Sequence, residues 1–308
     1  MNQIDKRFAN LLQDIRLLKE KELYYRIRSA FESVSMEVKV NMMNFFSQFP
    51  YWGKIDLDHH VYEEIELKVK ELKEHLKDFE DLYWHLNDYR SKKILYAILN
   101  NWVYYDFLSL SQVQEQCFDD YFDLDLIPEC KNEVFVDLGA YIGDSTLSFI
   151  KNYGIDSYQK IYTYEVTPEA YQLLQKNLEP YPNIIYYLKG VGDHLGKASL
   201  LSNEESISAN TLLIDEEGDT QITTLDEDIQ EKITIIKADI EGFEQQMIKG
   251  ARQHILKDHP KLLISVYHSN EDLWKIPQMI REIDDSYRFY LRYHGGSIYP
   301  TEITLIAI

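Results

Sequence analysis

Two side chains suited to proton transfer follow two strands that the sequence predicts to be buried. Asp239 follows the apolar run 233–238, and His268 follows the run 261–267. Because ligands of open α/β sheets bind at the carboxyl ends of the strands, we expect both side chains at that edge. Carboxylates such as Asp239 and Glu241 are costly to place near a core unless they are used. The pattern therefore predicts a working carboxylate at Asp239 and a base or orienting role for His268.

A glycine-rich turn follows a third predicted strand, at 134–138. Residues 136–146 read Val-Asp-Leu-Gly-Ala-Tyr-Ile-Gly-Asp-Ser-Thr, and a helix is predicted to begin at their end. Gly139 and Gly143 let the backbone turn tightly and approach a ligand, and the helix N-terminus offers free N–H groups. The last three residues of the turn are equally suited to cap the helix. The spacing differs from the Gly-x-Gly-x-x-Gly of nicotinamide-binding proteins.

Two more acids follow predicted strands. Glu165 ends the strand 161–165, where a carboxylate can accept hydrogen bonds from the hydroxyls of a ribose in a doubly wound sheet. Asp193 lies in a glycine turn after the strand 184–188, and this turn borders the base of a nucleoside in such sheets. Asp193 could accept from an adenine amino group, or it could simply belong to the turn.

These residues need a sheet that brings several strand ends together. Seven strands are expected, at 134–138, 161–165, 184–188, 233–238, 261–267, 288–293 and 303–308, with helices near 143–153, 167–178, 242–257 and 271–283. Alternation of strands and helices favours parallel strands and a sheet covered on both faces. The loop 294–302 is too short for a crossover helix, so the last two strands should pair antiparallel. The expected fold class is α/β, a doubly wound, mostly parallel sheet with an antiparallel last strand.

The first part of the chain has a different pattern, and we expect a helical N-terminal domain at 1–128 before an α/β domain at 129–308. Apolar residues at alternating spacings of four and three form a seam, at Ile65, Val69, Leu72, Leu76, Phe79, Tyr83 and Leu86. Such a seam is typical of one helix in a small bundle or of a coiled-coil dimer contact. The domain would then act as a lid or as a dimerisation surface. The acidic stretch 198–231 is expected to be an insertion with an edge strand or two.

Composition limits the partners. Lys and Arg number 32 and Asp and Glu number 52, which gives a net charge of -20 at pH 7. Nucleic-acid backbones and anionic membrane surfaces attract proteins with the opposite charge, so neither is expected as a partner. The apolar runs fall far short of the ~20 residues that cross a bilayer, and the first residues lack a signal core. We therefore expect a cytoplasmic protein.

Together these motifs resemble the FkbM family of S-adenosylmethionine-dependent methyltransferases, over roughly 133–308. The resemblance rests on residues 136–144, on Tyr-Glu-Val-Thr-Pro-Glu at 164–169, and above all on Lys-Ala-Asp-Ile-Glu-Gly-Phe-Glu at 237–244. It implies the class I methyltransferase sheet and methyl transfer, commonly to an oxygen of a sugar, a natural product or another small molecule. Ala238 departs from the family pattern, which usually has a bulkier aliphatic residue there.

The resemblance also implies a cofactor site for S-adenosylmethionine. Asp137, Gly139 and Gly143 would hold its methionine end and sugar, Glu165 its ribose, and Asp193 would face its adenine. The other residues expected at the cofactor come from the same motifs: Ala140, Tyr141, Asp144, Ser145, Val166 and Asp239.

The implied reaction is an in-line attack of a hydroxyl oxygen of a small acceptor on the sulfonium methyl group. Asp239 and His268 are the candidates for removing the hydroxyl proton without a metal; alternatively they would hold Mg²⁺. Two other interpretations remain at this point: a nicotinamide-dependent oxidoreductase on a similar sheet, and a cofactor-binding protein without turnover.

Overall fold

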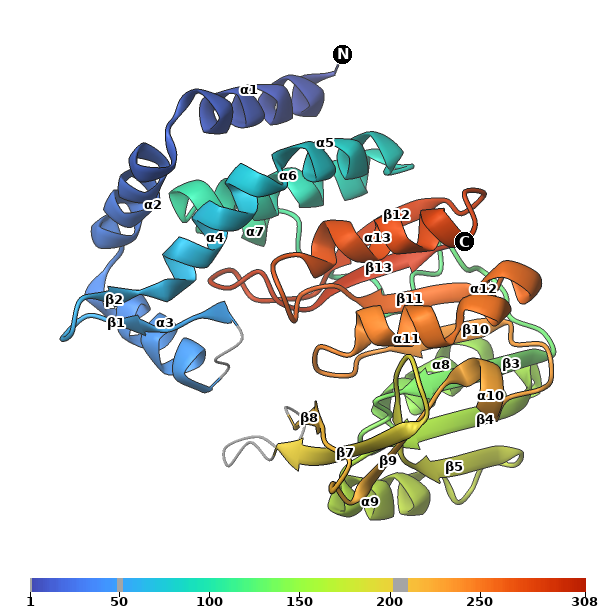
Figure 1. Cartoon of the computed structure of the whole chain (residues 1–308). Coiled ribbons are helices and arrows are strands. Elements are labelled where there is room, and N and C mark those ends of the chain that lie inside the picture. The colour runs from blue at the N-terminus through green and yellow to red at the C-terminus, as the bar shows by residue number, and fades with distance from the viewer. Residues whose placement is uncertain (1, 49–51, 202–209) are drawn as a thin grey trace. The chain divides into compact units, whose positions relative to one another are not determined.

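The computed structural model of the chain describes residues 2–48, 52–201 and 210–308 (Figure 1). The chain forms two compact units, each assembled from separate parts of the sequence. The first unit contains residues 1–116, 266–277 and 288–303, and the second contains 117–265, 278–287 and 304–308. Residues 117–128, which the sequence analysis grouped with the helical half, therefore belong to the second unit. The division of the protein into domains at 128 and 129 stays a prediction.

The first unit contains the helical N-terminal region. Its helices are α1 (Gln3–Leu17), α2 (Glu20–Ser33), α3 (Met36–Gln48), α4 (Glu63–Glu74), α5 (Leu76–His85), α6 (Tyr89–Tyr104) and α7 (Phe107–Ser111). A short antiparallel pair, β1 (Ile55–Asp56) and β2 (Val61–Tyr62), lies between α3 and α4. Within the described part of the chain, no helix is both long enough and apolar enough to cross a membrane.

The apolar seam 65–86 is divided between two helices, because α4 ends and α5 begins at His75. All seven of its apolar side chains are buried. Phe8 of α1 stacks on Tyr83 with 3.9 Å between ring centroids, and the Tyr83 hydroxyl donates to Asp5 Oδ1 at 2.8 Å. The seam is therefore core of the helical unit, as in a small bundle. A homodimer, which stays a prediction, would need another surface.

The strand β12 (Phe289–Tyr293) also belongs to the first unit. Arg292 of this strand is buried and pairs with Asp88, the N-cap of α6, at 3.0 Å. The His294 N–H donates to the Glu302 carbonyl oxygen at 2.9 Å across the loop that follows β12. These contacts hold residues 288–303 against α6 of the same unit.

The second unit contains the sheet that the sequence predicts. Its strands lie in the order β13-β11-β10-β3-β4-β5. Their bounds are β3 (Glu133–Leu138), β4 (Tyr158–Glu165), β5 (Ile184–Leu188), β10 (Ile235–Ala238), β11 (Lys261–Ser265) and β13 (Ile303–Ala307). The pairs from β11 to β5 are all parallel, and β13 is antiparallel to β11. The α/β class, the mostly parallel sheet and its antiparallel last strand are confirmed.

Helices cover both faces of this sheet. They are α8 (Asp144–Tyr153), α9 (Pro168–Leu178), α10 (Leu225–Asp228), α11 (Glu244–Gly250), α12 (Arg252–Asp258) and the last part of α13 (Asp272–Ile283). Figure 1 shows α11 and α12 on the viewer's side of the strands and α8 on the far side. The predicted helix 242–257 is divided after Gly250. A Cβ atom at Gly250 would lie 1.9 Å from the Gly192 carbonyl oxygen, so only glycine allows the turn at 192 to approach this closely.

The acidic stretch 198–231 differs from its prediction. Instead of edge strands on the main sheet, it contributes to a separate sheet with the order β6-β9-β7-β8. Its strands are β6 (Gly190–Val191), β7 (Gly196–Leu201), β8 (Thr211–Ile214) and β9 (Thr220–Thr223). Pairing of the described strands β7, β8 and β9 with one another satisfies backbone groups that would otherwise need another partner, and residues 202–209 of the stretch lie outside the described residues.

Candidate functional site

The carboxyl ends of three neighbouring strands form one side of a pocket in the second unit. Leu138 of β3 pairs in register with Ala238 of β10 on one side and with Tyr164 of β4 on the other. The glycine turn after β3, Glu165 at the end of β4 and Asp239 after β10 therefore lie at one edge of the sheet. This edge is where ligands bind in open α/β sheets.

The pocket has a volume of about 580 Å³, including open solvent at its mouth. Five residues of the predicted cofactor site line it: Gly139, Tyr141, Glu165, Val166 and Asp239. Gly190 and Val191, from the turn that was predicted to border the base of a nucleoside, also line it. The other lining residues were not predicted as ligand contacts: Leu138, Tyr164, Thr167, Lys189, Asn210, Thr211, Leu212, Ile240, Glu241 and Phe243. Residues 210–212 had no recognisable signal, because they reach the pocket only through the smaller sheet.

Gly139 lets two turns of the pocket wall approach each other. Its φ is +69°, and a Cβ atom there would lie 1.8 Å from the Asp239 carbonyl oxygen. No other residue fits that space. Gly143 has a φ of +91° and is the N-cap of α8. The glycines predicted from the motif thus have separate tasks, since the first shapes the pocket wall and the second starts the helix behind it.

Asp137 stabilises the glycine turn through buried hydrogen bonds and an ion pair. Its side chain is fully buried, and its Oδ2 accepts hydrogen bonds from Ser145 Oγ and Thr146 Oγ1, each at 2.6 Å. Its Oδ1 lies 3.2 Å from Lys237 Nζ. Asp137 and Ser145 are outside the described lining of the pocket, and their contacts stabilise the turn; their predicted roles in cofactor binding stay predictions.

Lys237 is the buried cation of this turn. Its ammonium donates to the carbonyl oxygens of Gly139 at 2.8 Å and of Leu138 at 3.2 Å. Burial by itself would lower the pKa of Lys237, but the carboxylates of Asp137 and Asp239 more than offset it, so the pKa is raised above its ordinary value. Lys237 therefore stays charged and fixes the backbone that leads into the pocket.

Glu165 is buried and lines the pocket. Its Oε2 accepts the Tyr141 N–H at 2.8 Å, and its Oε1 accepts the N–H groups of Val166 at 2.9 Å and Thr167 at 2.8 Å. Burial raises the pKa of the Glu165 carboxyl above its ordinary value, against the lowering effect of these backbone donors. The Thr167 side chain also hydrogen-bonds this carboxylate. The backbone gives Oε2 one donor, the Tyr141 N–H, whereas it gives Oε1 two, so Oε2 is the oxygen we assign to a hydroxyl of a ligand.

Tyr121 is a site residue that sequence reasoning missed. Its hydroxyl donates to Asp239 Oδ2 at 2.7 Å and lies 3.3 Å from Ser265 Oγ at the end of β11. The Lys237 ammonium lies 5.2 Å from the centre of its ring, within range of a cation–π interaction. Its segment stood out in the sequence only by its acidic residues, and no motif identified this tyrosine.

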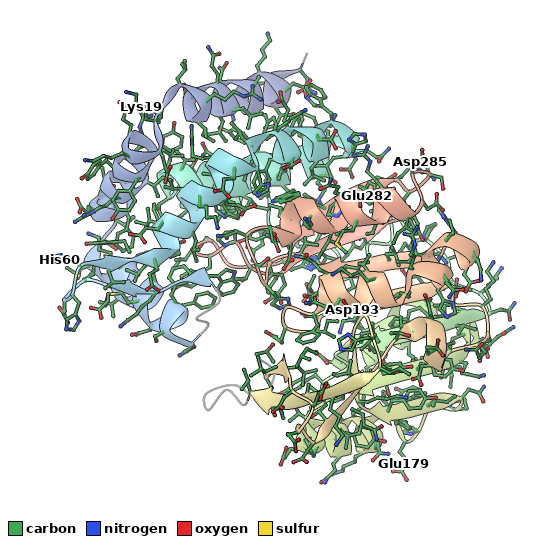
Figure 2. The ribbon with its side chains drawn as sticks, viewed as in Figure 1. Lys19, His60, Glu179, Asp193, Glu282 and Asp285 are labelled. Atoms are coloured by element: carbon green, nitrogen blue, oxygen red, sulfur yellow. The ribbon has the colours of Figure 1, made fainter. Side chains whose placement is uncertain are left out.

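The remaining predicted residues lie elsewhere. Asp193, labelled in Figure 2, is exposed; its carboxylate oxygens lie 2.7 Å from His194 Nδ1 and 3.7 Å from Lys249 Nζ. Lys189 to Val191, just before it, line the pocket in its place. Three other predicted residues are also outside the described lining: Ala140, Gly143 and Asp144. Their roles in cofactor binding stay predictions.

His268 belongs to the first unit, whereas Asp239 belongs to the second. His268 is buried, and its ring centroid lies 4.3 Å from that of Tyr267. The strand predicted at 261–267 ends at Ser265, so His268 lies three positions beyond the end of β11.

Comparison with known families decides what kind of protein this is. Residues 137–295, slightly more than half of the chain, match the model of the methyltransferase FkbM domain. The chain belongs to the FkbM methyltransferase family. Members of this family use S-adenosylmethionine, so the expected family and cofactor are confirmed.

A solved FkbM methyltransferase from Methylobacillus flagellatus KT has a TM-score of 0.67 and 25% sequence identity. The match covers 81% of this FkbM chain and 63% of that one, so this chain spans less than two thirds of that protein. Fibrillarin from Aeropyrum pernix, solved with S-adenosylmethionine, has a TM-score of 0.39 at 12% identity and covers 65% of this chain and 74% of its own. A comparison with curated proteins finds no match.

Proposed function

We propose that this FkbM methyltransferase transfers the methyl group of S-adenosylmethionine to a hydroxyl oxygen of a small molecule. We propose further that the cofactor binds in the pocket at the ends of β3, β4 and β10. One observation carries this assignment: Gly139 lets the turns after β3 and β10 close into one pocket wall, and the buried residue Glu165 lines the same pocket. A nucleoside site needs a tight glycine turn after a strand and an acidic acceptor for the sugar after the next one.

The residues divide the work of binding. Glu165 accepts a ribose hydroxyl through Oε2, and the three backbone N–H groups keep its carboxylate in place. The apolar side chains of Val166, Val191 and Leu212 offer surface to the adenine ring. Bound there, the cofactor supplies an electrophilic methyl group on a sulfonium sulfur.

The chain also has to take a proton from the acceptor hydroxyl as its oxygen attacks. Asp239 is our first candidate, because its carboxylate lines the pocket and Tyr121 holds Oδ2 in one orientation. His268 is the second candidate, with the proton accepted on a ring nitrogen. Alignment of the attacking oxygen with the methyl group contributes up to ~7–11 kcal/mol in favourable intramolecular cases. The acceptor is proposed to be neutral or cationic, because the chain has a net charge of -20.

Tyr121→Phe is expected to lower kcat about tenfold, since a hydrogen bond to a charged group contributes ~1.5–3 kcal/mol and the orientation of Asp239 is lost with it. The affinity for S-adenosylhomocysteine should stay within about twofold of the parent value. Steady-state kinetics and calorimetry measure the two quantities. Tyr153→Phe is the matched control, because it removes a half-buried hydroxyl that donates to the Ile127 carbonyl oxygen. An equal loss of kcat in both variants would contradict a positioning role.

Glu165 gives cofactor binding a pH dependence. Only the ionised carboxylate is a full acceptor, and its raised pKa means that protonation occurs at a higher pH than in an ordinary glutamate. We therefore expect the affinity for S-adenosylhomocysteine to fall as pH drops through a value above 4.5, the ordinary pKa. Glu165→Gln should bind about tenfold more weakly at neutral pH and lose this dependence. Calorimetric titrations from pH 5 to pH 8 measure it; a glutamine variant with the parent's pH profile would contradict the assignment.

The reaction itself is tested by incubating the protein and S-adenosylmethionine with a labelled methyl group together with a panel of hydroxylated, amino and thiol acceptors. Mass spectrometry should find the label on oxygen. Label found solely on nitrogen or sulfur would overturn the O-methylation, and no labelled product with any acceptor would favour a binding protein.

Turnover should be unchanged in excess chelator, because we assign proton removal to Asp239 or His268 without a metal. Loss of turnover that Mg²⁺ restores would reverse that assignment.

A further inference from the structure

The first unit contains a second cavity, separate from the pocket proposed for the cofactor. It has a volume of about 450 Å³, including open space at its mouth. Its walls come from the end of α3, from α4 and α6, and from residues 266–273 and 299–303, all of them parts of the first unit. Nothing in the proposed methyl transfer uses this cavity.

One wall of the cavity is a row of near-parallel aromatic rings. The Phe45 ring lies 4.0 Å from the Tyr299 ring at 10°, and 5.1 Å from the Trp52 ring at 14°. Trp52 Nε1 donates to the Tyr267 carbonyl oxygen at 2.7 Å, which fixes the indole at the end of the row. Because these rings already stack on one another, a flat ligand would extend the row by stacking on a ring at its end or by meeting the ring edges, and either contact buries further apolar area.

The cavity also contains a buried ion pair. Glu64 and Lys68 are one helical turn apart on α4, they are 2% and 5% exposed, and their charged groups contact each other. The Tyr105 hydroxyl donates to Glu64 Oε2 at 3.1 Å, and its ring centroid lies 5.1 Å from Lys68 Nζ. The contacts of Lys68 within the described ranges are this pair and this ring, whereas an ammonium has three donors.

A buried ion pair is a poor source of stability, because removing two charges from water offsets their attraction. At the wall of a cavity, however, such an ion pair can recognise a polar group of a ligand. It presents a donor, Lys68, beside an acceptor, Glu64, and the two charges cancel. A hydroxyl group can both donate and accept a hydrogen bond, so it matches this pair. An anion would be repelled by the carboxylate of Glu64, and a cation would be repelled by the ammonium of Lys68.

We propose that this cavity binds a small neutral molecule made of a planar aromatic ring with a hydroxyl group, a phenol in the broad sense. The ring would lie against the wall of Phe45, Trp52 and Tyr299, and the hydroxyl would donate to Glu64 and accept from Lys68. The aliphatic side chains of Val266, Leu273 and Ile303 offer apolar surface on the cavity walls. A sugar would bring four or five hydroxyls into this mostly apolar cavity, and each unpaired one opposes binding.

The test is a calorimetric titration of the full chain, without cofactor, with three probes: 2-naphthol, 2-methoxynaphthalene and methyl β-D-glucopyranoside. We expect 2-naphthol to bind at least about tenfold more tightly than the ether, which has no hydroxyl donor, and than the glucoside. Binding of none of the three, equal binding of naphthol and ether, or tighter binding of the glucoside would overturn the proposal.

Variants locate the binding. Glu64→Gln combined with Lys68→Met removes the pair without leaving one charge buried, and Trp52→Leu removes one ring of the wall. Each should weaken 2-naphthol binding about tenfold or more. Trp84→Leu is the matched control, because Trp84 is 52% exposed and lies outside the cavity lining. Should the double variant fail to fold, the two tryptophan variants decide alone: equal affinities in Trp52→Leu and Trp84→Leu would refute the site.

Discussion

Gly139→Ala is expected to weaken cofactor binding at least about 100-fold and to destabilise the protein by about 2–5 kcal/mol. The new Cβ atom would lie 1.8 Å from the Asp239 carbonyl oxygen, which belongs to backbone and cannot rotate away. The turn after β3 and the turn after β10 must then separate, and both line the pocket. A φ of +69° adds the strain that a side chain brings to a left-handed conformation. Urea unfolding and titration with S-adenosylhomocysteine measure the two effects.

Gly154→Ala separates the steric effect from the backbone strain. Gly154 has a φ of +88°, yet no described atom lies within 4 Å of the place its Cβ would occupy. Its ψ of 162° places it in a region that essentially only glycine adopts, so this variant should lose about 1–3 kcal/mol through backbone strain alone and should bind S-adenosylhomocysteine as the parent does. If both alanine variants bound the ligand equally well, the close approach at Gly139 would have no part in cofactor binding.

Lys237→Met has the second large effect, a destabilisation of about 3–5 kcal/mol, because it leaves the Asp137 carboxylate buried without its cation. The carbonyl oxygens of Leu138 and Gly139 also lose their donor. The raised pKa of Lys237 predicts the pH dependence of this contribution. In the parent it is complete below the ordinary lysine pKa of 10.5 and is lost as pH rises through the higher folded value.

Two further variants test this account of the pair. Asp137→Asn combined with Lys237→Met removes both charges and should recover part of the stability lost in the single variant, because no buried charge stays unpaired. Lys131→Met, at a side chain that is 82% exposed, should change the free energy of unfolding by less than about 0.5 kcal/mol. A double variant less stable than Lys237→Met would show that the ion pair is not the cause.

The sequence predicted a structural feature correctly where one residue type has a single physical role at its position. Glycine at 139 and an acid at 165, each after an apolar run, predicted the two features that now face the pocket. The parallel strands and the antiparallel end followed from the lengths of the connections. Asp193 was harder to place from the sequence, because its surroundings depend on Lys249 of a helix far along the chain. It is outside the described pocket lining, and its role at the adenine stays a prediction.

Tertiary contacts explain what the sequence did not predict. Tyr121 reaches Asp239 across 118 positions of the chain, and no periodicity or spacing connects such residues. The apolar seam was recognised, but a seam of regular spacing passes through the break at His75 unchanged, so it did not reveal two helices. Likewise, residues 210–212 reach the pocket through a small sheet whose pairing of β7 with β8 and β9 is set by contacts within the insertion.

The cofactor pocket is tested most directly by a crystal structure of the protein with S-adenosylhomocysteine. Our account predicts a ribose hydroxyl within hydrogen-bond distance of Glu165 Oε2, the ligand's sugar against the backbone of Gly139, and its sulfur on the side of the pocket where Asp239 lies. A ligand bound elsewhere, with Glu165 contacting only the backbone N–H groups that it already accepts, would contradict it.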